Sequence, residues 1–305
     1  MRVRPLRARS RPVRVLSAVA AVLIAVGTLA GCVVDESALD TKPLKITVAE
    51  QPEIAALLPP AIRESGRLRI GTNPPYQPNE FKNREGEIIG FDVDLVDAIA
   101  QVLGVRPEYN EADFDKIIPA IQAGSFDMGM SSFTDSVERE KEVDFVDYFS
   151  AGVQWAAKAG RDIDPDNACG LRVGVQATTV EDTDEVPAKS EACLKAGKDP
   201  IIKVKFDTQD QAVNAVLLGQ VDAFSADSPV TAYAIKKTDG QLAAVGPTYD
   251  AAPYGFPVVK GSALGPAVQQ AVQYLIDNGQ YEQIAKHWGV EAGMITVAEI
   301  NGAAK

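Results

Sequence analysis

The stretch that decides the fold is Gly90-Phe91-Asp92-Val93-Asp94-Leu95-Val96-Asp97-Ala98-Ile99-Ala100-Gln101-Val102-Leu103-Gly104. Its apolar residues recur three and four positions apart, the spacing of one helix face: Leu95, Ala98, Ile99, Val102 and Leu103. Gly104 follows, and glycine commonly ends a helix because it adopts the left-handed conformation at low cost. Upstream, Leu68 and Ile70 alternate with polar residues over 67–72, which predicts a strand. We therefore interpret the stretch as the helix of a strand–helix unit.

The same alternation continues outward from this unit. Further helices are predicted at 53–65, 114–123, 137–141, 180–196, 209–218, 229–237, 264–278 and 281–288. Further strands are predicted at 126–130, 153–158, 171–175, 201–206, 221–225, 242–245 and 255–259. Repeated units of this kind predict an α/β protein with mostly parallel sheets and helices on both faces.

Further motifs precede and follow the Gly90–Gly104 stretch along the chain. They are Gly71-Thr72-Asn73-Pro74-Pro75-Tyr76-Gln77-Pro78, Ile118-Pro119-Ala120-Ile121-Gln122-Ala123-Gly124, Ser131-Ser132-Phe133-Thr134 with Glu138-Arg139, Val143-Asp144-Phe145, Gly174-Val175-Gln176-Ala177-Thr178-Thr179, Val221-Asp222-Ala223-Phe224-Ser225-Ala226-Asp227 and Lys286-His287-Trp288-Gly289. Together with the Gly90 stretch they resemble the amino-acid-binding proteins that serve ABC importers, solute-binding family 3. The resemblance covers nearly all of 66–289.

The resemblance implies a type II periplasmic-binding-protein-like fold. Such a fold has two lobes, each a mostly parallel sheet flanked by helices, with two hinge crossings and the ligand in the cleft. Lobe 1 would comprise 45–150 and 254–305, lobe 2 would comprise 151–253, and the hinges would lie at 148–152 and 250–254. The strand–helix pattern breaks at both places. Closure of the lobes about such hinges is the motion expected on ligand binding.

A cleft for a free amino acid has to compensate a carboxylate and an ammonium out of water. Arg139 matches the family's carboxylate-binding arginine, and a guanidinium suits this task because it donates two parallel hydrogen bonds. As a cation in a predicted first helical turn, it also opposes the helix dipole. Asp227 matches the family's ammonium-binding aspartate. The alternatives are a solvated surface arginine and an aspartate that caps the helix begun by Pro229.

Seven further residues match ligand-contacting positions of the family. Ser132, Thr134 and Thr179 would contact the main-chain groups of the ligand, although turn and cap chemistry is an alternative for such residues. Gln176 would lie nearby by the same match. Tyr76 and Phe114 would form aromatic walls around the ligand side chain, and Asn73 would contact its head group.

Some positions depart from the family pattern. The head-group position is often aspartate, so the neutral Asn73 favours an amide or other polar ligand over arginine or lysine. Thr178 stands where glycine is usual, Asn79 where an aromatic residue is commoner, and Ala226 where a larger one is common. Asp92, Asp94 and Asp97 are interpreted as solvated charges at the start of a helix, not as ligand contacts.

The N-terminus has the features of an export signal. Six arginines precede an apolar run over 15–30 that is short for a membrane-spanning helix. The run ends in Leu29-Ala30-Gly31-Cys32, which resembles the bacterial lipobox, so Cys32 is predicted to be lipidated. The alternative is an uncleaved anchor helix. We therefore predict a signal peptide at 1–32, a flexible linker at 33–44, and tethering to the outer face of the cell membrane by lipid alone.

The composition argues against some classes of partner and cofactor. Without the six leading arginines, 24 basic residues face 42 acidic ones, so the net charge is about −18, which disfavours nucleic acid as a partner. Cys169 and Cys193 are predicted to form a disulfide outside the cytoplasm, with two free buried cysteines as the alternative. The chain has no CxxC and its single histidine is His287, so neither a metal site nor a cofactor is expected.

The sequence thus predicts a binding protein, not an enzyme. It would capture a polar amino acid and deliver it to the permease of an ABC importer, and we expect a monomer. One alternative is a sensor that signals through a receptor. Another is an enzyme similar to the cyclohexadienyl dehydratases of the same fold, but the predicted cleft residues offer salt bridges and no obvious general acid or base.

Overall fold

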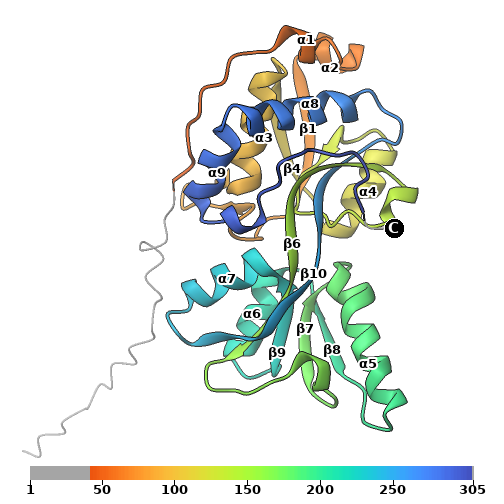
Figure 1. Ribbon diagram of the computed structural model, residues 1–305, viewed down its shortest axis with the longest axis vertical. Coiled ribbons are helices and arrows are strands. Elements are labelled where there is room, and N and C mark those ends of the chain that lie inside the picture. Colours follow the sequence, from red (N-terminus) through yellow and green to blue (C-terminus); the bar gives the residue numbers. More distant parts are fainter. Residues whose placement is uncertain (1–41, 304–305) are drawn as a thin grey trace, which may run out of the picture. The chain divides into compact units, whose positions relative to one another are not determined.

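The computed structural model describes residues 42–303. The predicted signal peptide, Cys32 and nearly all of the predicted linker lie outside the described residues. Within the described part, helices flank a large central sheet (Figure 1). The predicted two-lobed α/β fold is confirmed.

One eight-stranded sheet has the order β4–β1–β5–β10–β6–β9–β7–β8. Its strands are β1 (Arg67–Thr72), β4 (Arg106–Glu111), β5 (Met128–Gly129), β6 (Asp144–Lys158), β7 (Arg172–Gln176), β8 (Ile202–Phe206), β9 (Ala223–Asp227) and β10 (Leu242–Val258). β1 pairs in parallel with β4 and β5, and β7 pairs in parallel with β8 and β9. A separate antiparallel pair is formed by β2 (Phe81–Lys82) and β3 (Ile88–Ile89).

The helices are α1 (Pro52–Ala55), α2 (Pro60–Ser65), α3 (Phe91–Val102), α4 (Phe114–Gln122), α5 (Val186–Lys195), α6 (Gln209–Leu217), α7 (Ser228–Lys237), α8 (Leu264–Asp277) and α9 (Gln280–Trp288). Short 3₁₀ turns are η2 (Arg139–Lys141), η3 (Pro165–Asn167) and η5 (Glu291–Gly293), and η4 (Glu181–Glu185) is π-helical. The predicted helix 180–196 therefore divides into η4 and α5, and the predicted helix 53–65 divides into α1 and α2.

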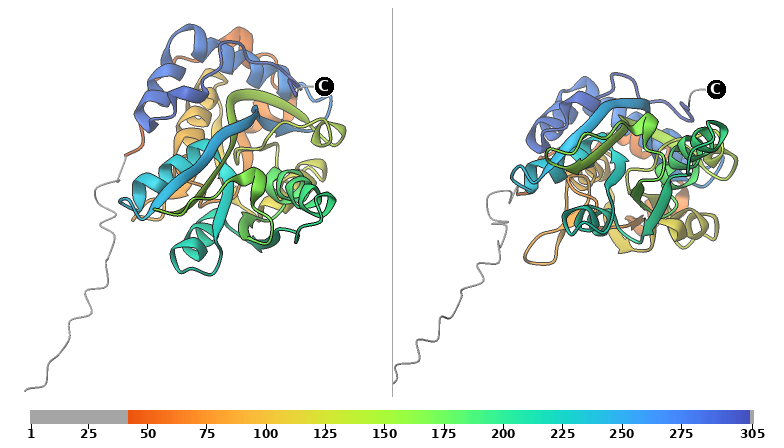
Figure 2. Two further views of the ribbon diagram at one scale, coloured as in Figure 1. Left: turned by 60° about the horizontal axis from the view of Figure 1, so that its bottom comes forward. Right: turned by 90° about the horizontal axis from the view of Figure 1, so that it is seen from below.

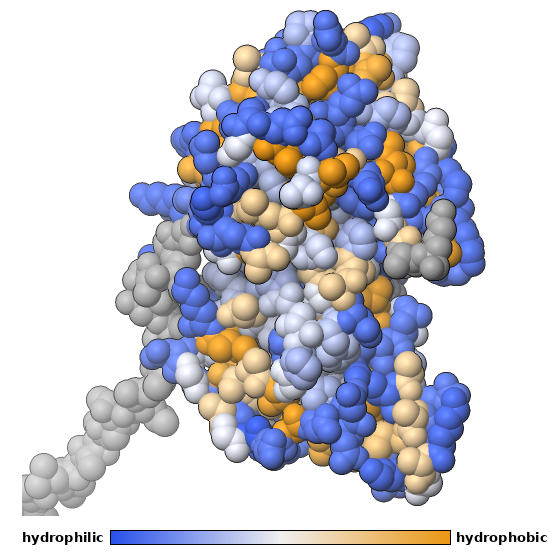
Figure 3. Space-filling model, in the orientation of Figure 1, coloured by the Kyte–Doolittle hydropathy of each residue, from blue (hydrophilic) through white to orange (hydrophobic). Residues whose placement is uncertain are grey.

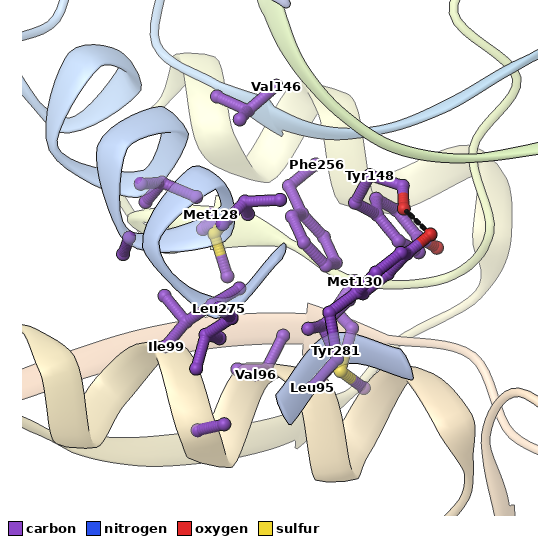
Figure 4. Packing of buried hydrophobic residues seen from close by; sticks show 14 of the residues in the cluster. Leu95, Val96, Ile99, Met128, Met130, Val146, Tyr148, Phe256, Leu275 and Tyr281 are labelled. Atoms are coloured by element: carbon purple, nitrogen blue, oxygen red, sulfur yellow. Dashed lines mark hydrogen bonds between the residues drawn. The ribbon is translucent and has the colours of Figure 1, made fainter. Parts of the chain in front are cut away.

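Each lobe has its own hydrophobic core. In lobe 1, α3, α8 and α9 pack on one face of the sheet (Figure 4), and α4 packs on the other. Leu95 and Ile99 of the first-quoted stretch are fully buried there. In lobe 2, α5 packs on one face and α6 and α7 on the other.

Two long strands belong to both cores. β6 and β10 run antiparallel side by side from lobe 1 into lobe 2 (Figures 1 and 2). In β6, the change from one core to the other falls between Ala151 and Val153. The pairing with β10 shifts register between Val245 and Tyr249 and again before Ala252, and such irregularities bend a strand pair locally. We propose that lobe 1 comprises 45–150 and 254–305 and that lobe 2 comprises 151–253.

The two long strands β6 and β10 differ from part of the strand prediction. The strands predicted at 242–245 and 255–259 are one strand, β10, and the strand predicted at 153–158 is the end of the longer β6. The predicted hinges therefore lie inside continuous strands. Pro253 and Pro257 interrupt the apolar alternation of β10. The strand nevertheless continues, because residues on both sides of each proline pair with β6.

The outer surface seen in Figure 3 is mostly hydrophilic, with apolar residues in small groups among polar ones. Exposed large apolar side chains include Val137, Leu194, Ile202, Leu218, Val259 and Val297. No helix within residues 42–303 combines the length and the hydrophobicity that a membrane crossing needs. Across the same residues no cluster of histidine, cysteine and acidic side chains is arranged to hold a metal ion.

A disulfide joins Cys169 to Cys193, the pairing that the sequence predicts. Their Cα atoms are 5.5 Å apart. Cys193 lies in α5 and Cys169 precedes β7, so the bond fixes one end of α5 to the lobe 2 sheet.

We predict that replacing both Cys169 and Cys193 by alanine lowers the free energy of unfolding by about 3 kcal/mol, because the unfolded chain loses a cross-link. Thermal unfolding with and without a reductant checks this, and the alanine variant should be insensitive to the reductant. Since neither cysteine lines the candidate site, ligand affinity should stay unchanged. An unaltered melting temperature would contradict the prediction.

Candidate functional site

A small cavity lies where loops of lobe 1 meet loops of lobe 2. Its lining is Asn73, Tyr76, Phe114, Ser131, Ser132, Thr134, Arg139, Gln176, Thr179, Val180, Glu181 and Asp227. All nine residues that the sequence predicts to bind a ligand are among them. Ser131, Val180 and Glu181 were not predicted.

Arg139 begins η2 and extends its guanidinium into the cavity. Nη1 donates to the carbonyl of Thr134 at 2.9 Å, and Nη2 donates to the carbonyl of Thr178 at 3.1 Å. The guanidinium carbon lies 5.6 Å from the ring centre of Phe114 and 5.8 Å from that of Phe133, distances at which a cation and an aromatic face attract. These contacts fix the position of the guanidinium. They leave N–H donors available for an anion, since a guanidinium has five.

Asp227 is the last residue of β9, at the carboxyl end of the strand where open α/β sheets bind ligands. Although it precedes α7, its side chain makes no capping hydrogen bond. Instead, the hydroxyl of Tyr76 donates to Oδ2 of Asp227 at 2.6 Å. Burial raises the pKa of Asp227, while the Tyr76 hydroxyl and the positive charge of Arg139 oppose that shift. The structure thus places the carboxylate in the cavity and not on the helix end.

The lobe 2 loop after β7 supplies Gln176 and Thr179. The hydroxyl of Thr179 donates to the carbonyl of Gln176 at 2.9 Å. Thr178 has a φ of 65°, in the left-handed region that favours glycine. This conformation accounts for the glycine that the family usually has here. The strain at Thr178 turns its carbonyl toward Arg139, and Asp182 accepts from its N–H at 2.9 Å.

Asn73 already has its amide occupied by the protein. Its Nδ2 donates to the carbonyl of Ala112 at 2.9 Å, and its Oδ1 accepts from Nε2 of Gln176 at 2.9 Å. The second contact joins the two lobes. A head-group role for Asn73, as the sequence predicts, would require this contact to open.

Tyr76 and Phe114 contribute aromatic surface to the cavity, as the sequence predicts. Phe114 stacks on Phe133 with ring centres 4.4 Å apart and planes 15° apart. Tyr76 is 6% exposed, and burial together with the charge of Asp227 raises the pKa of its hydroxyl well above the usual value. It therefore stays a neutral donor to Asp227.

Ser131 and Ser132 donate hydrogen bonds to buried carboxyl groups. The hydroxyl of Ser131 donates to Oε1 of Glu80 at 2.6 Å, and the backbone N–H of Ser132 donates to Oδ2 of Asp92 at 3.2 Å. Tyr148 donates to the same Asp92 oxygen at 2.7 Å. Asp92 is fully buried and Asp94 is 4% exposed, so the prediction that they are solvated helix-terminal charges is wrong for these two. Both face inward because the loop at Ser132 and the indole of Trp288 supply donors.

Glu181, which the sequence analysis missed, is the first residue of η4 and is 1% exposed. Burial, with the negative charge of Asp227, raises its pKa to about 8. The sequence predicts a helix over 180–196, in which Glu181 is the second residue and has no assigned contact with the ligand. The signal that would have found it is its spacing, two residues after a predicted ligand threonine.

The two lobes are closed over the cavity. Hydrogen bonds cross the cavity from Tyr76 to Asp227, from Gln176 to Asn73, and from Arg139 to the Thr178 carbonyl. The cavity measures about 10 Å³, roughly the space that one water molecule needs. An amino acid therefore has to enter by separation of the lobes.

The buried carboxyls predict a pH dependence of stability. The folded-state pKa is about 6 for Asp92, about 8 for Asp147 and about 8 for Glu181. All three exceed the ordinary values, so the folded protein binds more protons than the unfolded chain between about pH 4 and 8. Stability without ligand should therefore fall as pH rises through this range.

Melting temperatures at pH 5, 6, 7 and 8 check this sign. The highest value is expected near pH 5, with a drop of several degrees by pH 8. A melting temperature that increases from pH 5 to 8 would show that these carboxyls are not held in their protonated forms.

Comparisons with known proteins agree with the geometry of the cavity in indicating a binding protein. The sequence profile of "Bacterial extracellular solute-binding proteins, family 3" matches residues 68–291. The arginine-binding protein ArgT of Corynebacterium glutamicum is 44% identical over 293 residues, 95% of this chain and 96% of that protein.

Solved structures of an ancestral arginine-binding protein are similar as well. One has arginine bound and is 35% identical, with a TM-score of 0.67, over 73% of this chain and 98% of that one. Another has glutamine bound, with the same identity and TM-score, over 74% and 99%. The prediction of an amino-acid-binding protein, and not an enzyme, is confirmed by these matches. The chain belongs to family 3 of the bacterial extracellular solute-binding proteins.

Proposed function

We propose that this protein captures a cationic amino acid, arginine, outside the cytoplasmic membrane and delivers it to the permease of an ABC importer. The observation that carries the proposal is the meeting of Arg139 and Asp227 in one closed cavity. Arg139 would bind the α-carboxylate and Asp227 the α-ammonium. Main-chain recognition of this kind is independent of the ligand side chain.

Arginine is favoured over an amide ligand for two reasons. ArgT, at 44% identity, is an arginine-binding protein, and the cavity contains an acidic residue, Glu181, that the sequence analysis did not take into account. The neutral Asn73 therefore no longer argues for a neutral ligand. Tyr76 and Phe114 would cover the aliphatic part of the arginine side chain.

Binding is tested by thermal unfolding of the purified protein with each of the twenty amino acids, ornithine and citrulline. A ligand at one hundred times its dissociation constant stabilises the folded state by about 2.7 kcal/mol. Arginine should give the largest shift. No shift with any amino acid would contradict the proposal.

Delivery and anchoring need separate tests in cells. Deleting the gene should abolish high-affinity uptake of labelled arginine, and Cys32→Ser should release the protein from the membrane fraction. The proposal of a monomer is checked by light scattering. Uptake that is unaffected by the deletion would favour the receptor-linked alternative.

A further inference from the structure

The charges that line the cavity do not balance. Arg139 is its one basic lining residue, and Asp227 and Glu181 are its two acidic ones. An amino acid contributes one carboxylate and one ammonium, which Arg139 and Asp227 would compensate. Glu181 would then remain as a buried carboxyl with no counter-charge of its own, so that its ionised form is costly until a further cation binds.

Among the described residues, one oxygen of the Glu181 carboxyl, Oε1, is without a hydrogen-bond partner. The neighbouring bases are engaged elsewhere, since Lys203 and Lys205 both pair with Asp182, at 2.7 and 2.8 Å. Arg139 directs its guanidinium to the carbonyls of Thr134 and Thr178.

The backbone at Glu181 is itself unusual. Glu181 is the first residue of the five-residue π-helical turn η4, three residues after Thr178 with its left-handed φ and two after the cavity residue Thr179. π-helical turns are rare and occur frequently at functional sites. Glu181 at the start of the turn lines the cavity, whereas Glu185 at its other end accepts a hydrogen bond from Trp155 in the lobe 2 core.

We propose that Glu181 is the residue that recognises the cationic side chain of the ligand and makes the site prefer a cationic amino acid over a neutral one of the same shape. This inference rests on the proposed function. A guanidinium suits the site because it donates two parallel hydrogen bonds to one carboxylate. Lobe 2 would thus supply the side-chain acid, while Asn73 of lobe 1 stays bonded within the protein.

The protonation of Glu181 gives the proposal a second readout. The groups around it are Asp227 at the end of β9, Glu185 on the same turn, Arg139 of η2 and Tyr76 of lobe 1. Its pKa of about 8 in the ligand-free site should fall when a cation binds. Arginine binding should therefore release a proton at pH 7, and arginine affinity should increase from pH 6 to pH 8.

The decisive experiment compares arginine with citrulline, its neutral isostere, by calorimetry at pH 7.5 on wild-type protein and on Glu181→Gln. Wild-type protein should bind arginine more tightly than citrulline. In the variant, the ratio of the two affinities should fall by at least about tenfold, as expected when a charged hydrogen bond of 1.5–3 kcal/mol is lost. Citrulline affinity should remain within a few-fold of its wild-type value.

Glu185→Gln is the matched control. Glu185 lies on the same turn and is likewise shielded from solvent, but it accepts from Trp155 at 3.1 Å and Tyr249 at 2.6 Å outside the cavity lining. Its replacement should leave the arginine-to-citrulline ratio and the proton release unchanged.

Two results would overturn the assignment. An equal loss of arginine and citrulline affinity in Glu181→Gln would mean that Glu181 only positions the loop or Arg139. An unchanged ratio would mean that another group recognises the side-chain charge. In both cases wild-type binding of arginine would still support the proposed function, whereas wild-type protein that binds neither ligand would end that proposal first.

Discussion

Arg139→Ala should weaken arginine binding by roughly 30- to 5,000-fold, because truncating one partner of a buried charge pair costs about 2–5 kcal/mol. Within lobe 1, Arg139 is held by the ring of Phe114 and the carbonyl of Thr134. Its guanidinium is therefore in position before the ligand arrives, and the loss should appear directly in the dissociation constant. Calorimetric titration with arginine measures it.

Two comparisons separate charge from packing at this position. Arg139→Lys keeps the positive charge but not the planar fork, so its affinity should lie between those of wild-type and Arg139→Ala. Agmatine, which lacks the α-carboxylate, should bind wild-type protein and Arg139→Ala with similar affinity. Agmatine affinity that falls as far as arginine affinity would show that Arg139 does not bind the carboxylate.

Asp227→Asn should weaken arginine binding by a similar factor, about 30-fold or more, because the α-ammonium loses its only charged partner on the main-chain side. The asparagine has the same shape and can still accept from the Tyr76 hydroxyl, which lies 2.6 Å from Asp227 now. The fold should be preserved, since Asp227 makes no capping bond to α7. Ligand-free unfolding checks this point.

Tyr76→Phe is the control for Asp227→Asn. It removes the hydroxyl and leaves the carboxylate charge, so its effect on arginine affinity should be much smaller. A larger loss in Tyr76→Phe than in Asp227→Asn would mean that the interlobe hydrogen bond, and not the carboxylate, governs binding.

The placement of Arg139 and Asp227 at one cavity could be predicted from the sequence because motifs fix their positions. Arg139 follows Ser131-Ser132-Phe133-Thr134 at a set distance, and Asp227 ends a strand of apolar residues. Both sit where strands and loops of an α/β sheet bring their side chains to one edge. Local pattern and family resemblance therefore sufficed for them.

Neither the place of Glu181 nor β4 could be predicted from local sequence patterns. Glu181 was missed because it lies in the first turn of the predicted helix 180–196, whereas the structure has a π-helical turn there and Glu181 lines the cavity. β4 (Arg106–Glu111) was missed because it is an edge strand whose side chains are polar and partly exposed. Asp92 was misplaced because its burial depends on donors from Ser132 and Tyr148, which are distant in the sequence.

Local sequence patterns also did not predict that β6 and β10 are each one long strand. Prolines and polar residues in β10 between Val245 and Tyr254 suggested two strands with a break. Long-range pairing with β6 keeps the strand extended through that segment. Tertiary pairing thus overrode the local preference.

The crystal structure of this protein with arginine bound tests the central claim most directly. It should show the α-carboxylate on the guanidinium of Arg139, the α-ammonium on Asp227, and the side-chain guanidinium within hydrogen-bond distance of Glu181. A ligand bound outside the cleft, or one whose carboxylate and ammonium are both remote from residues 139 and 227, would contradict the account.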